Sequence, residues 1–171
     1  ESFMAQVPES VLVVLDEAYV EYATDSHFMN GFDYVDKYPN LLVSRTFSKA
    51  YGLASLRVGY AIASPDVTNI LNRVRQPFNV NSFALAAAAA SLQDDEFVAQ
   101  SRALNSTGMA QLEAGLSALG LNYIPSKANF IAFDTGRPCL PVFNALLQQG
   151  VIVRPVANYG MPSYLRVSIG L

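Results

Sequence analysis

One lysine of this sequence has neighbours that suit covalent chemistry with a carbonyl compound. The chain contains three lysines, and Lys49 alone lies among Ser, Thr and Gly residues. Residues 41–44, an apolar run that predicts a β-strand, come shortly before it. A lysine at the mouth of a parallel sheet can be desolvated, which makes its amine a nucleophile toward carbonyls. The pattern therefore predicts Schiff-base chemistry at Lys49.

An acid and a phenol follow an earlier apolar run. Asp16 and Tyr19 come after residues 11–15, whose continuous β-branched and apolar side chains predict a buried strand of a parallel sheet. Ligands of open α/β sheets bind at the carboxyl ends of the strands. Pyridoxal phosphate (PLP), a cofactor that forms Schiff bases with lysine, needs a carboxylate at its pyridine nitrogen and gains from a phenol near its ring oxygen. Asp16 and Tyr19 are suited to these two contacts.

The phosphate of such a cofactor calls for hydroxyl groups and a planar cation. Thr46 and Ser48 precede the lysine, and Arg57 follows it by eight residues. These side chains are suited to hold a phosphate through charge-assisted hydrogen bonds. Together with the acid, the phenol and the lysine, they complete one side of a predicted PLP site.

The elements that must position these residues are predicted from apolar periodicity and from capping residues. Residues 41–44 and 58–63 predict two more strands of the same buried, parallel kind. A helix is expected to start at Ser64-Pro65-Asp66, because Ser caps, Pro tolerates the first turn and Asp suits the positive helix end. The remaining expectations are a loop at 76–81, a helix capped by Ser82 and running to Leu92, a helix from Asp94 toward Leu119 that Gly120 ends, strands at 129–134, 151–153 and 164–169, and a helix at 141–149. This order predicts an α/β fold followed by a small α+β domain.

The composition excludes several classes of partner. A net charge of −3 without a run of Lys or Arg gives no electrostatic footprint for nucleic acid or an anionic membrane, so we expect neither as a partner. The most apolar stretch, 83–92, is too short to span a bilayer. Cys139 and His27 are the single residues of their types, so no metal-ligand spacing exists around them and no metal is expected. One cysteine also indicates a reducing cytoplasm.

Three segments of the chain resemble histidinol-phosphate aminotransferase, a fold-type I PLP enzyme. They are residues 12–19, residues 44–60, and the tail from 150–155 to 165–170. The similarity runs along essentially the whole chain and covers roughly the second half of such an enzyme. It implies that residues 1–105 are part of the PLP-binding large domain, with a mostly parallel sheet and helices on both faces. It further implies that residues 106–171 are the small C-terminal domain, incomplete at its C-terminus.

The resemblance also implies a role for each candidate residue. Lys49 is implied to form the Schiff base and to carry a proton as general base and acid. Asp16 is implied to pair with the ring nitrogen, and Tyr19 to bond the ring oxygen. The other implied contacts are Thr46, Ser48 and Arg57 with the cofactor phosphate, Arg166 with a substrate carboxylate or phosphate, Arg154 with a phosphate, and Asn129 near the substrate carboxylate.

The implied reaction moves the amino group of glutamate to imidazole-acetol phosphate in histidine biosynthesis. The expected small-molecule partners are therefore histidinol phosphate, glutamate and 2-oxoglutarate. The implied assembly is a homodimer whose site borrows residues across the interface. The family's glycine-containing phosphate loop, and its aromatic residue stacked on the ring, have no counterpart in these residues. The chain alone is therefore expected to be catalytically poor or inactive.

Other interpretations fit the same residues. Asp16-Glu17 after a strand also fits a Walker B site that holds Mg²⁺, although no Gly-x-x-x-x-Gly-Lys-Ser/Thr loop accompanies it. A PLP-dependent aromatic aminotransferase, or a decarboxylase of a phosphorylated amino acid, would share nearly every residue named above. A folded, non-catalytic fragment is a further alternative. Arg166 also fits a solvent-facing position of an alternating strand, and Asn129 fits a turn.

Overall fold

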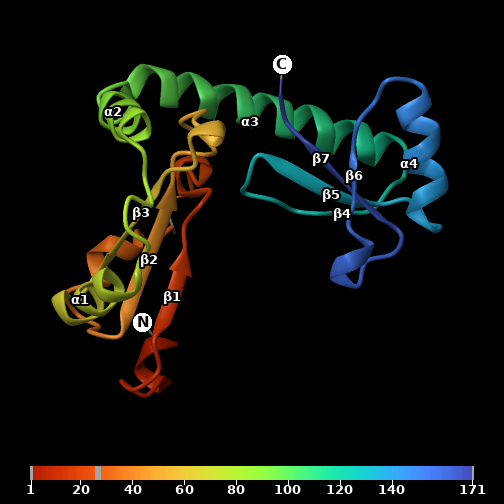
Figure 1. The fold of residues 1–171 in the computed structure, drawn as a ribbon. Helices are drawn as coiled ribbons and strands as arrows, with labels where there is room; N and C mark the ends of the chain where they lie inside the picture. Colours follow the sequence, from red (N-terminus) through yellow and green to blue (C-terminus); the bar gives the residue numbers. More distant parts are fainter. Residues whose placement is uncertain (1, 26–27, 171) are drawn as a thin grey trace. The chain divides into compact units, whose positions relative to one another are not determined.

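The computed structural model describes residues 2–25 and 28–170 and divides them into two compact units. The first unit ends at Val98 and the second begins at Ala99, inside helix α3 (Asp95–Ala118) (Figure 1). The boundary expected at 105/106 lies in the same helix and stays a prediction. His27, expected to have no metal role, lies outside the described residues.

A three-stranded sheet forms the centre of the first unit. Its strands are β1 (Val13–Asp16), β2 (Leu41–Thr46) and β3 (Gly59–Ala63), in the order β1-β2-β3. β1 and β2 are parallel, as their apolar runs predict. β3 is antiparallel to β2, so the prediction of a third parallel strand is wrong. Residues 47–58 connect the two strands without an α-helix, and the bond from Phe47 N to Val58 O (3.2 Å) continues the antiparallel ladder past the end of β2.

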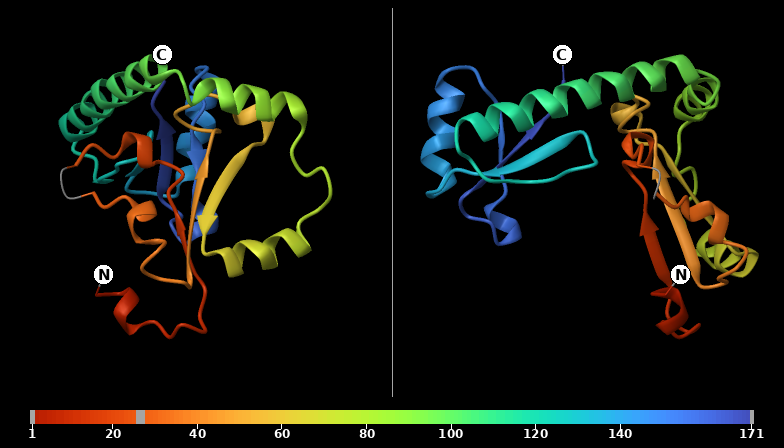
Figure 2. Two further views of the ribbon diagram at one scale, coloured as in Figure 1. Left: turned by 90° about the vertical axis from the view of Figure 1, so that its left-hand side faces the viewer. Right: turned by 180° about the vertical axis from the view of Figure 1, so that it is seen from behind.

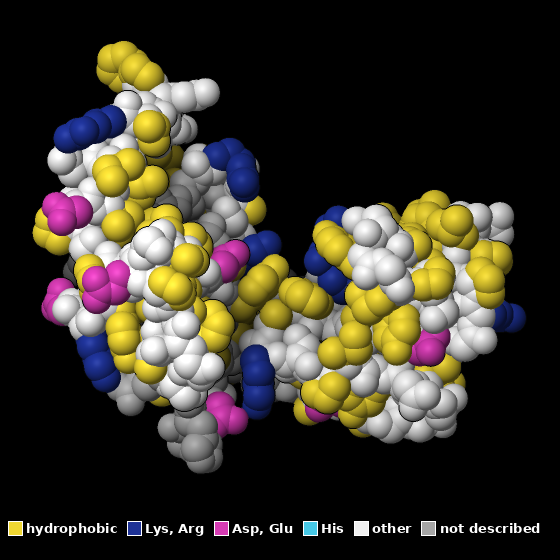
Figure 3. All heavy atoms as spheres, turned by 90° about the horizontal axis from the view of Figure 1, so that it is seen from below, with side chains coloured by type: hydrophobic (Ala, Val, Ile, Leu, Met, Phe, Trp, Pro, Cys, Tyr) yellow, Lys and Arg dark blue, Asp and Glu magenta, His cyan; other side chains and the backbone are white. Residues whose placement is uncertain are grey.

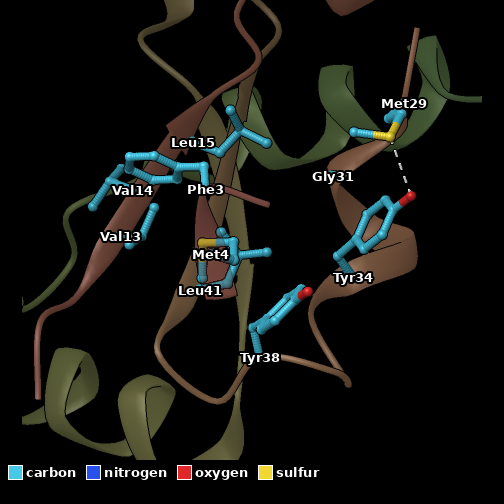
Figure 4. A pocket seen from close by; sticks show the side chains of 10 residues that line it. All are labelled: Phe3, Met4, Val13, Val14, Leu15, Met29, Gly31, Tyr34, Tyr38 and Leu41. Atoms are coloured by element: carbon cyan, nitrogen blue, oxygen red, sulfur yellow. Dashed lines mark hydrogen bonds between the residues drawn. The ribbon is translucent and has the colours of Figure 1, made fainter. Parts of the chain in front are cut away.

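The burial of the strands differs from the prediction at β1. The first three residues of β2, Leu41 to Val43, are buried, but Val14 of β1 is 58% exposed. β1 is the first strand in the order, so only one of its edges pairs within the described residues. β1 side chains also line an apolar pocket of about 330 Å³, together with residues such as Met4, Tyr34 and Leu41 (Figure 4). The predicted buried strand is therefore an exposed edge in this chain.

Two helices of the first unit begin where the sequence predicts but are capped differently. α1 (Pro65–Val74) starts after Ser64, whose hydroxyl donates to the carbonyl of Pro39 (2.9 Å) instead of capping the helix. α2 (Ser82–Ser91) is capped by Asn81, whose Oδ1 accepts from Ala84 N (2.8 Å), so the prediction of Ser82 as the cap is wrong. Asn is as good a cap as Ser, and one position earlier its oxygen reaches the N3 amide. Figure 1 shows α2 near the carboxyl ends of β1 and β2, and α1 near their amino ends.

The second unit is a four-stranded antiparallel sheet with helices. The strand order is β4-β5-β7-β6, and all three pairings are antiparallel. Ile131 and Leu165 have no exposed surface and anchor its centre. The elements after α3 are β4 (Tyr123–Ile124), β5 (Phe130–Asp134), α4 (Cys139–Gln148), β6 (Arg154–Pro155) and β7 (Tyr164–Ser168). Figure 2 shows this unit from two further sides.

Two expectations for the second unit need correction, and one short strand was not predicted. Residues 151–153 are not a strand, because Val151 N donates to Leu146 O (2.9 Å) and completes the end of α4. The paired strand is β6, directly after them. Helix α4 begins two residues earlier than expected, at the buried Cys139. The short strand β4 was not predicted, because two residues carry no readable periodicity.

Hydrophobic side chains are also frequent on the surface. Figure 3 shows them in yellow over both units on the face that it draws. None of the helices in the part of the chain that the structure describes combines the length and the apolar character needed to cross a membrane.

Candidate active site

The parallel ladder between β1 and β2 brings two predicted groups of site residues to one end of a sheet. Asp16, the last residue of β1, pairs with Ser44. One further bond, from Glu17 N to Ser44 O (2.9 Å), extends the ladder past the end of β1. Both strands end at this edge, so the residues that follow them enter the same region.

Lys49 lies beside Tyr19 at this edge. Its Nζ is 5.1 Å from the centroid of the Tyr19 ring, within the range of a cation–π contact. Both side chains are half-buried, while Phe47 and Ala50 on either side of the lysine are buried and anchor the loop. The structure thus brings together an amine and a phenol that are thirty residues apart in the sequence.

Asp16 presents an exposed carboxylate at the end of β1. Its Oδ1 accepts a hydrogen bond from the backbone N–H of Ala18 (3.1 Å), which fixes the orientation of the side chain. A carboxylate with one oxygen held by the backbone can still accept at the other oxygen. This arrangement suits a contact with a protonated ring nitrogen.

Two hydroxyl groups and one guanidinium form a second cluster on the loop after β2. Thr46 Oγ1 accepts from Ser48 N (3.1 Å), and Arg57 Nη1 lies 3.5 Å from Ser48 Oγ. The same nitrogen donates to the carbonyl of Ala54 (2.8 Å). Arg57 is exposed, so the remaining guanidinium donors are accessible. Hydroxyls beside a planar cation suit an anion with several oxygens, such as phosphate.

Arg57 also has an unusual backbone conformation. Its φ of 52° and ψ of 52° place it in the left-handed region, which residues other than Gly, Asn and Asp rarely adopt. Strain of this kind concentrates at functional sites. The conformation turns the chain into β3 while it directs the arginine toward Ser48.

The phenol of Tyr51, two residues after Lys49, stays protonated well into the alkaline range. Burial raises its pKa above the ordinary value, and the nearby carboxylate of Glu21 raises it further. Tyr51 packs on Phe47 with ring centroids 5.0 Å apart. It therefore supports the loop as a neutral side chain.

A buried ion pair behind the site was not predicted from the sequence. Arg45 Nη2 donates to Glu17 Oε2 (2.7 Å), and the two side chains are 15% and 4% exposed. The other carboxylate oxygen, Oε1, accepts from Gly31 N (2.7 Å). A charged residue inside the predicted sheet was the available signal, because a buried charge requires a partner.

This ion pair argues against the Walker B interpretation. Both carboxylate oxygens of Glu17 already have partners, Oε2 the guanidinium of Arg45 and Oε1 the backbone N–H of Gly31. Among residues 2–25 and 28–170, no group of three or more His, Cys, Asp and Glu side chains is arranged to hold a metal ion.

The predicted substrate contacts form a separate group in the second unit. Arg154 of β6 and Arg166 of β7 are directly opposite each other in the antiparallel ladder. Arg166 also lies over the ring of Phe130, 4.7 Å from its centroid. Asn129 precedes β5 and accepts from Ile169 N at its carbonyl (2.8 Å). The candidate residues therefore fall into two groups, with six in the first unit and these three in the second.

Comparison with solved structures defines the fold. Histidinol-phosphate aminotransferase from Sinorhizobium meliloti, solved in complex with pyridoxal-5'-phosphate, superposes with a TM-score of 0.87 at 30% identity, covering 98% of this chain and 47% of that one. L-threonine-O-3-phosphate decarboxylase from Porphyromonas gingivalis has a TM-score of 0.80 at 24% identity, over 92% of this chain and 50% of that one. The α/β fold predicted from the sequence is therefore confirmed as that of fold-type I enzymes.

Sequence comparison defines the family. The model of aminotransferase class I and II matches residues 3–171, so the chain belongs to this family. The chain is 68% identical over 171 residues to "Histidinol-phosphate aminotransferase 2" of Pseudomonas aeruginosa, and covers 46% of that protein. The chain thus spans about half the length of the curated relatives it matches.

We predict that Arg57→Gly does not destabilise the chain, and raises its free energy of unfolding by up to about 1 kcal/mol. Glycine adopts a positive φ without the steric penalty that an arginine carries, which outweighs its greater entropy in the unfolded chain. Urea unfolding followed by circular dichroism measures the change. Arg75→Gly is the matched control, because Arg75 has an extended backbone (φ −65°) and glycine there should lower the stability. A clear loss of stability in Arg57→Gly would show that the conformation is not strained.

Proposed function

We propose that this chain carries the main PLP contacts of a histidinol-phosphate:2-oxoglutarate aminotransferase. The observation that carries the proposal is the position of Lys49, beside Tyr19 and at the sheet edge where β1 ends in Asp16. Two similarities support it: the Sinorhizobium meliloti enzyme solved with PLP is 30% identical, and histidinol-phosphate aminotransferase 2 of Pseudomonas aeruginosa is 68% identical.

The residues of the first unit fit the chemical groups of PLP. An amine, a phenol and an exposed carboxylate lie at the end of β1 and β2, and a cluster of hydroxyls with a guanidinium follows β2. Each has a counterpart in the cofactor: aldehyde, ring oxygen, ring nitrogen and phosphate. Bound PLP would supply an electron sink for the substrate's amino carbon.

Each of these residues would then perform a definite task. Asp16 would hold a proton on the ring nitrogen through its carboxylate, and Tyr19 would donate to the ring oxygen. Thr46, Ser48 and Arg57 would bind the phosphate, with Arg57 supplying the charge. The Nζ of Lys49 would anchor the cofactor, and once free it would move a proton as base and then as acid.

The three residues of the second unit support a role in substrate binding. Two arginines directly opposite each other in a sheet repel, and this cost is relieved when an anion binds between or beside them. A phosphate or carboxylate with paired oxygens suits two guanidinium groups. We therefore assign Arg166 and Arg154 to the phosphate or carboxylate of histidinol phosphate and glutamate, and Asn129 to the neighbourhood of the carboxylate.

The main alternative within the family is a different substrate. The fold does not discriminate, since the decarboxylase of threonine phosphate from Porphyromonas gingivalis shares it at a TM-score of 0.80. The arginine pair suits any phosphorylated amino compound. The identity of 68% to a histidinol-phosphate aminotransferase favours that substrate over the aromatic or decarboxylase alternatives. A non-catalytic fragment remains the alternative of another class, because the chain spans less than half of that relative.

Exposed apolar residues on one segment support a homodimer. Phe78 is 97% and Phe83 81% exposed, and Val74 and Leu85 on the flanking helices are exposed as well. Phe78 also has a positive φ of 56°, which is unusual for an aromatic residue. Contiguous apolar surface of this kind marks an interaction site. We assign this surface to contact with a second copy of the chain. We also propose a cytoplasmic location, which the single cysteine indicates.

The first prediction from the proposed function concerns PLP binding. We expect PLP added to the chain, or to a chimera that places the N-terminal part of the Pseudomonas aeruginosa relative before it, to give a visible absorbance band that borohydride removes. Lys49→Ala should abolish the band, whereas Lys37→Ala, a control on the same unit, should keep it. A band that survives Lys49→Ala would contradict the assignment. Absence of the band in both forms of the unmutated protein would refute the PLP proposal itself.

The second prediction concerns the arginine pair. In the chimera, Arg166→Gln should raise the KM for histidinol phosphate by at least about tenfold, because a hydrogen bond to a charged group contributes about 1.5–3 kcal/mol. Arg154→Gln should have a smaller effect, since Arg154 is exposed. Steady-state kinetics measure both, with Arg137→Gln as the control for loss of an exposed arginine. An unchanged KM in Arg166→Gln would exclude its substrate role.

The third prediction concerns the assembly. Light scattering after size-exclusion chromatography should give the chimera twice its chain mass. Phe78→Asp combined with Phe83→Ser should shift it to the monomer, because a charge cannot be buried in an apolar contact. Ile152→Asp, which places a charge on an exposed apolar residue of the other unit, is the control. A monomeric unmutated chimera, or a dimer that tolerates the double variant, would contradict the assigned surface.

A further inference from the structure

We propose that Glu17 and Arg45 are a positioning pair for the PLP site. They touch neither cofactor nor substrate in this proposal, and they act by holding the ends of β1 and β2 at a fixed separation. The proposal rests on the proposed function, because the positions of Asp16 and Thr46 matter in this way only if the chain binds PLP. The contact between Glu17 and Arg45 is observed within this chain.

Both oxygens of the Glu17 carboxylate accept hydrogen bonds. Arg45 approaches Glu17 Oε2 with two nitrogens, Nε at 3.0 Å and Nη2 at 2.7 Å. Glu17 Oε1 accepts from the backbone of Gly31 (2.7 Å). The carboxylate therefore has partners at both oxygens, as a buried charge requires.

A second set of contacts ties the pair to the segment after β1. Arg45 Nη2 also donates to Asn30 Oδ1 (2.7 Å), and that same oxygen caps a short helix by accepting from Phe32 N (3.1 Å). The guanidinium carbon of Arg45 lies 3.7 Å from the centroid of the Phe32 ring. One arginine thus joins β2 to the residues at 30–32.

The packing around the pair leaves no space at Gly31. A Cβ there would lie 2.7 Å from Glu17 Oε1 and 3.0 Å from Val43 Cγ2. The backbone of residue 31 therefore approaches the carboxylate as closely as a glycine permits. This close approach restricts the position of the Glu17 side chain, in addition to its hydrogen bonds.

The pair is placed to control two candidate cofactor contacts. Glu17 follows Asp16 directly, and Arg45 directly precedes Thr46. Side chains alternate between the faces of a sheet, so Asp16, Ser44 and Thr46 share the face opposite to Glu17 and Arg45. Fixing one face of both strand ends therefore fixes the direction of the site residues on the other face.

Stability alone does not account for such a pair. A buried ion pair can often be replaced by apolar side chains of similar volume without loss of stability, while removal of one partner leaves a costly unpaired charge. An arginine that donates to one carboxylate oxygen from two nitrogens differs from an apolar contact in that it defines both distance and orientation. The two roles can therefore be separated by experiment.

The test uses the chimera and four variants. Glu17→Gln and Arg45→Met each leave a partner unsatisfied, whereas Glu17→Met combined with Arg45→Met removes both charges. Asp33→Asn, a change to an exposed acid in the same segment, is the control. Thermal unfolding without PLP reports stability, and absorbance titration gives the Kd for PLP. The KM for histidinol phosphate is measured at saturating PLP.

We expect the double variant to recover the unfolding temperature that the single variants lose, while its Kd for PLP stays raised by about tenfold, as for other residues that orient ligand-binding groups. Its KM for histidinol phosphate should stay within about twofold, since the arginine contacts lie in the other unit.

A double variant that binds PLP as the unmutated chimera does would overturn the positioning role. If the double variant does not fold, Glu17→Asp decides, because it keeps the charge and shortens the reach: a raised Kd supports the proposal and an unchanged Kd overturns it. An unmutated chimera that binds no PLP refutes the proposed function instead, and this proposal with it.

Discussion

The parallel ladder between β1 and β2 joins two segments that are far apart in the sequence. Val13 pairs with Leu41 and Asp16 with Ser44, so both strands end at the same edge. The register also brings Glu17 beside Arg45, where an ion pair with both carboxylate oxygens engaged holds it. A slip of one residue would send every side chain to the opposite face. The location of Lys49, of Asp16, and of the cluster formed by Thr46, Ser48 and Arg57 therefore depends on this single pairing.

The two units distribute charge in different ways. In the first unit, the buried charges of Glu17 and Arg45 compensate each other. In the second unit, two arginines face each other in a ladder. Two arrangements carry a local cost, namely the opposed arginines and the left-handed backbone of Arg57 next to Ser48.

Much of this arrangement follows from local patterns in the sequence. Apolar runs predict β1 and β2, and the residue types that follow them predict the chemistry of Lys49. What local patterns miss depends on distant residues or on uncommon conformations. Glu17 finds Arg45 twenty-eight residues away, and no spacing rule indicates that contact. The left-handed conformation of Arg57 has no signal, because Gly and Asn usually occupy such positions. The exposure of β1 could not be predicted either, since an apolar run reports what a strand can bury and not what covers it.

We propose that the ends of β1 and β2 form a PLP site with Lys49 as the residue that holds the cofactor. To test this, the chimera is incubated with PLP, reduced with borohydride and digested, and the modified lysine is located by mass spectrometry. We expect the label on Lys49, at close to one equivalent per chain. A label on Lys37 or Lys127, or spread over many lysines without preference, would contradict it.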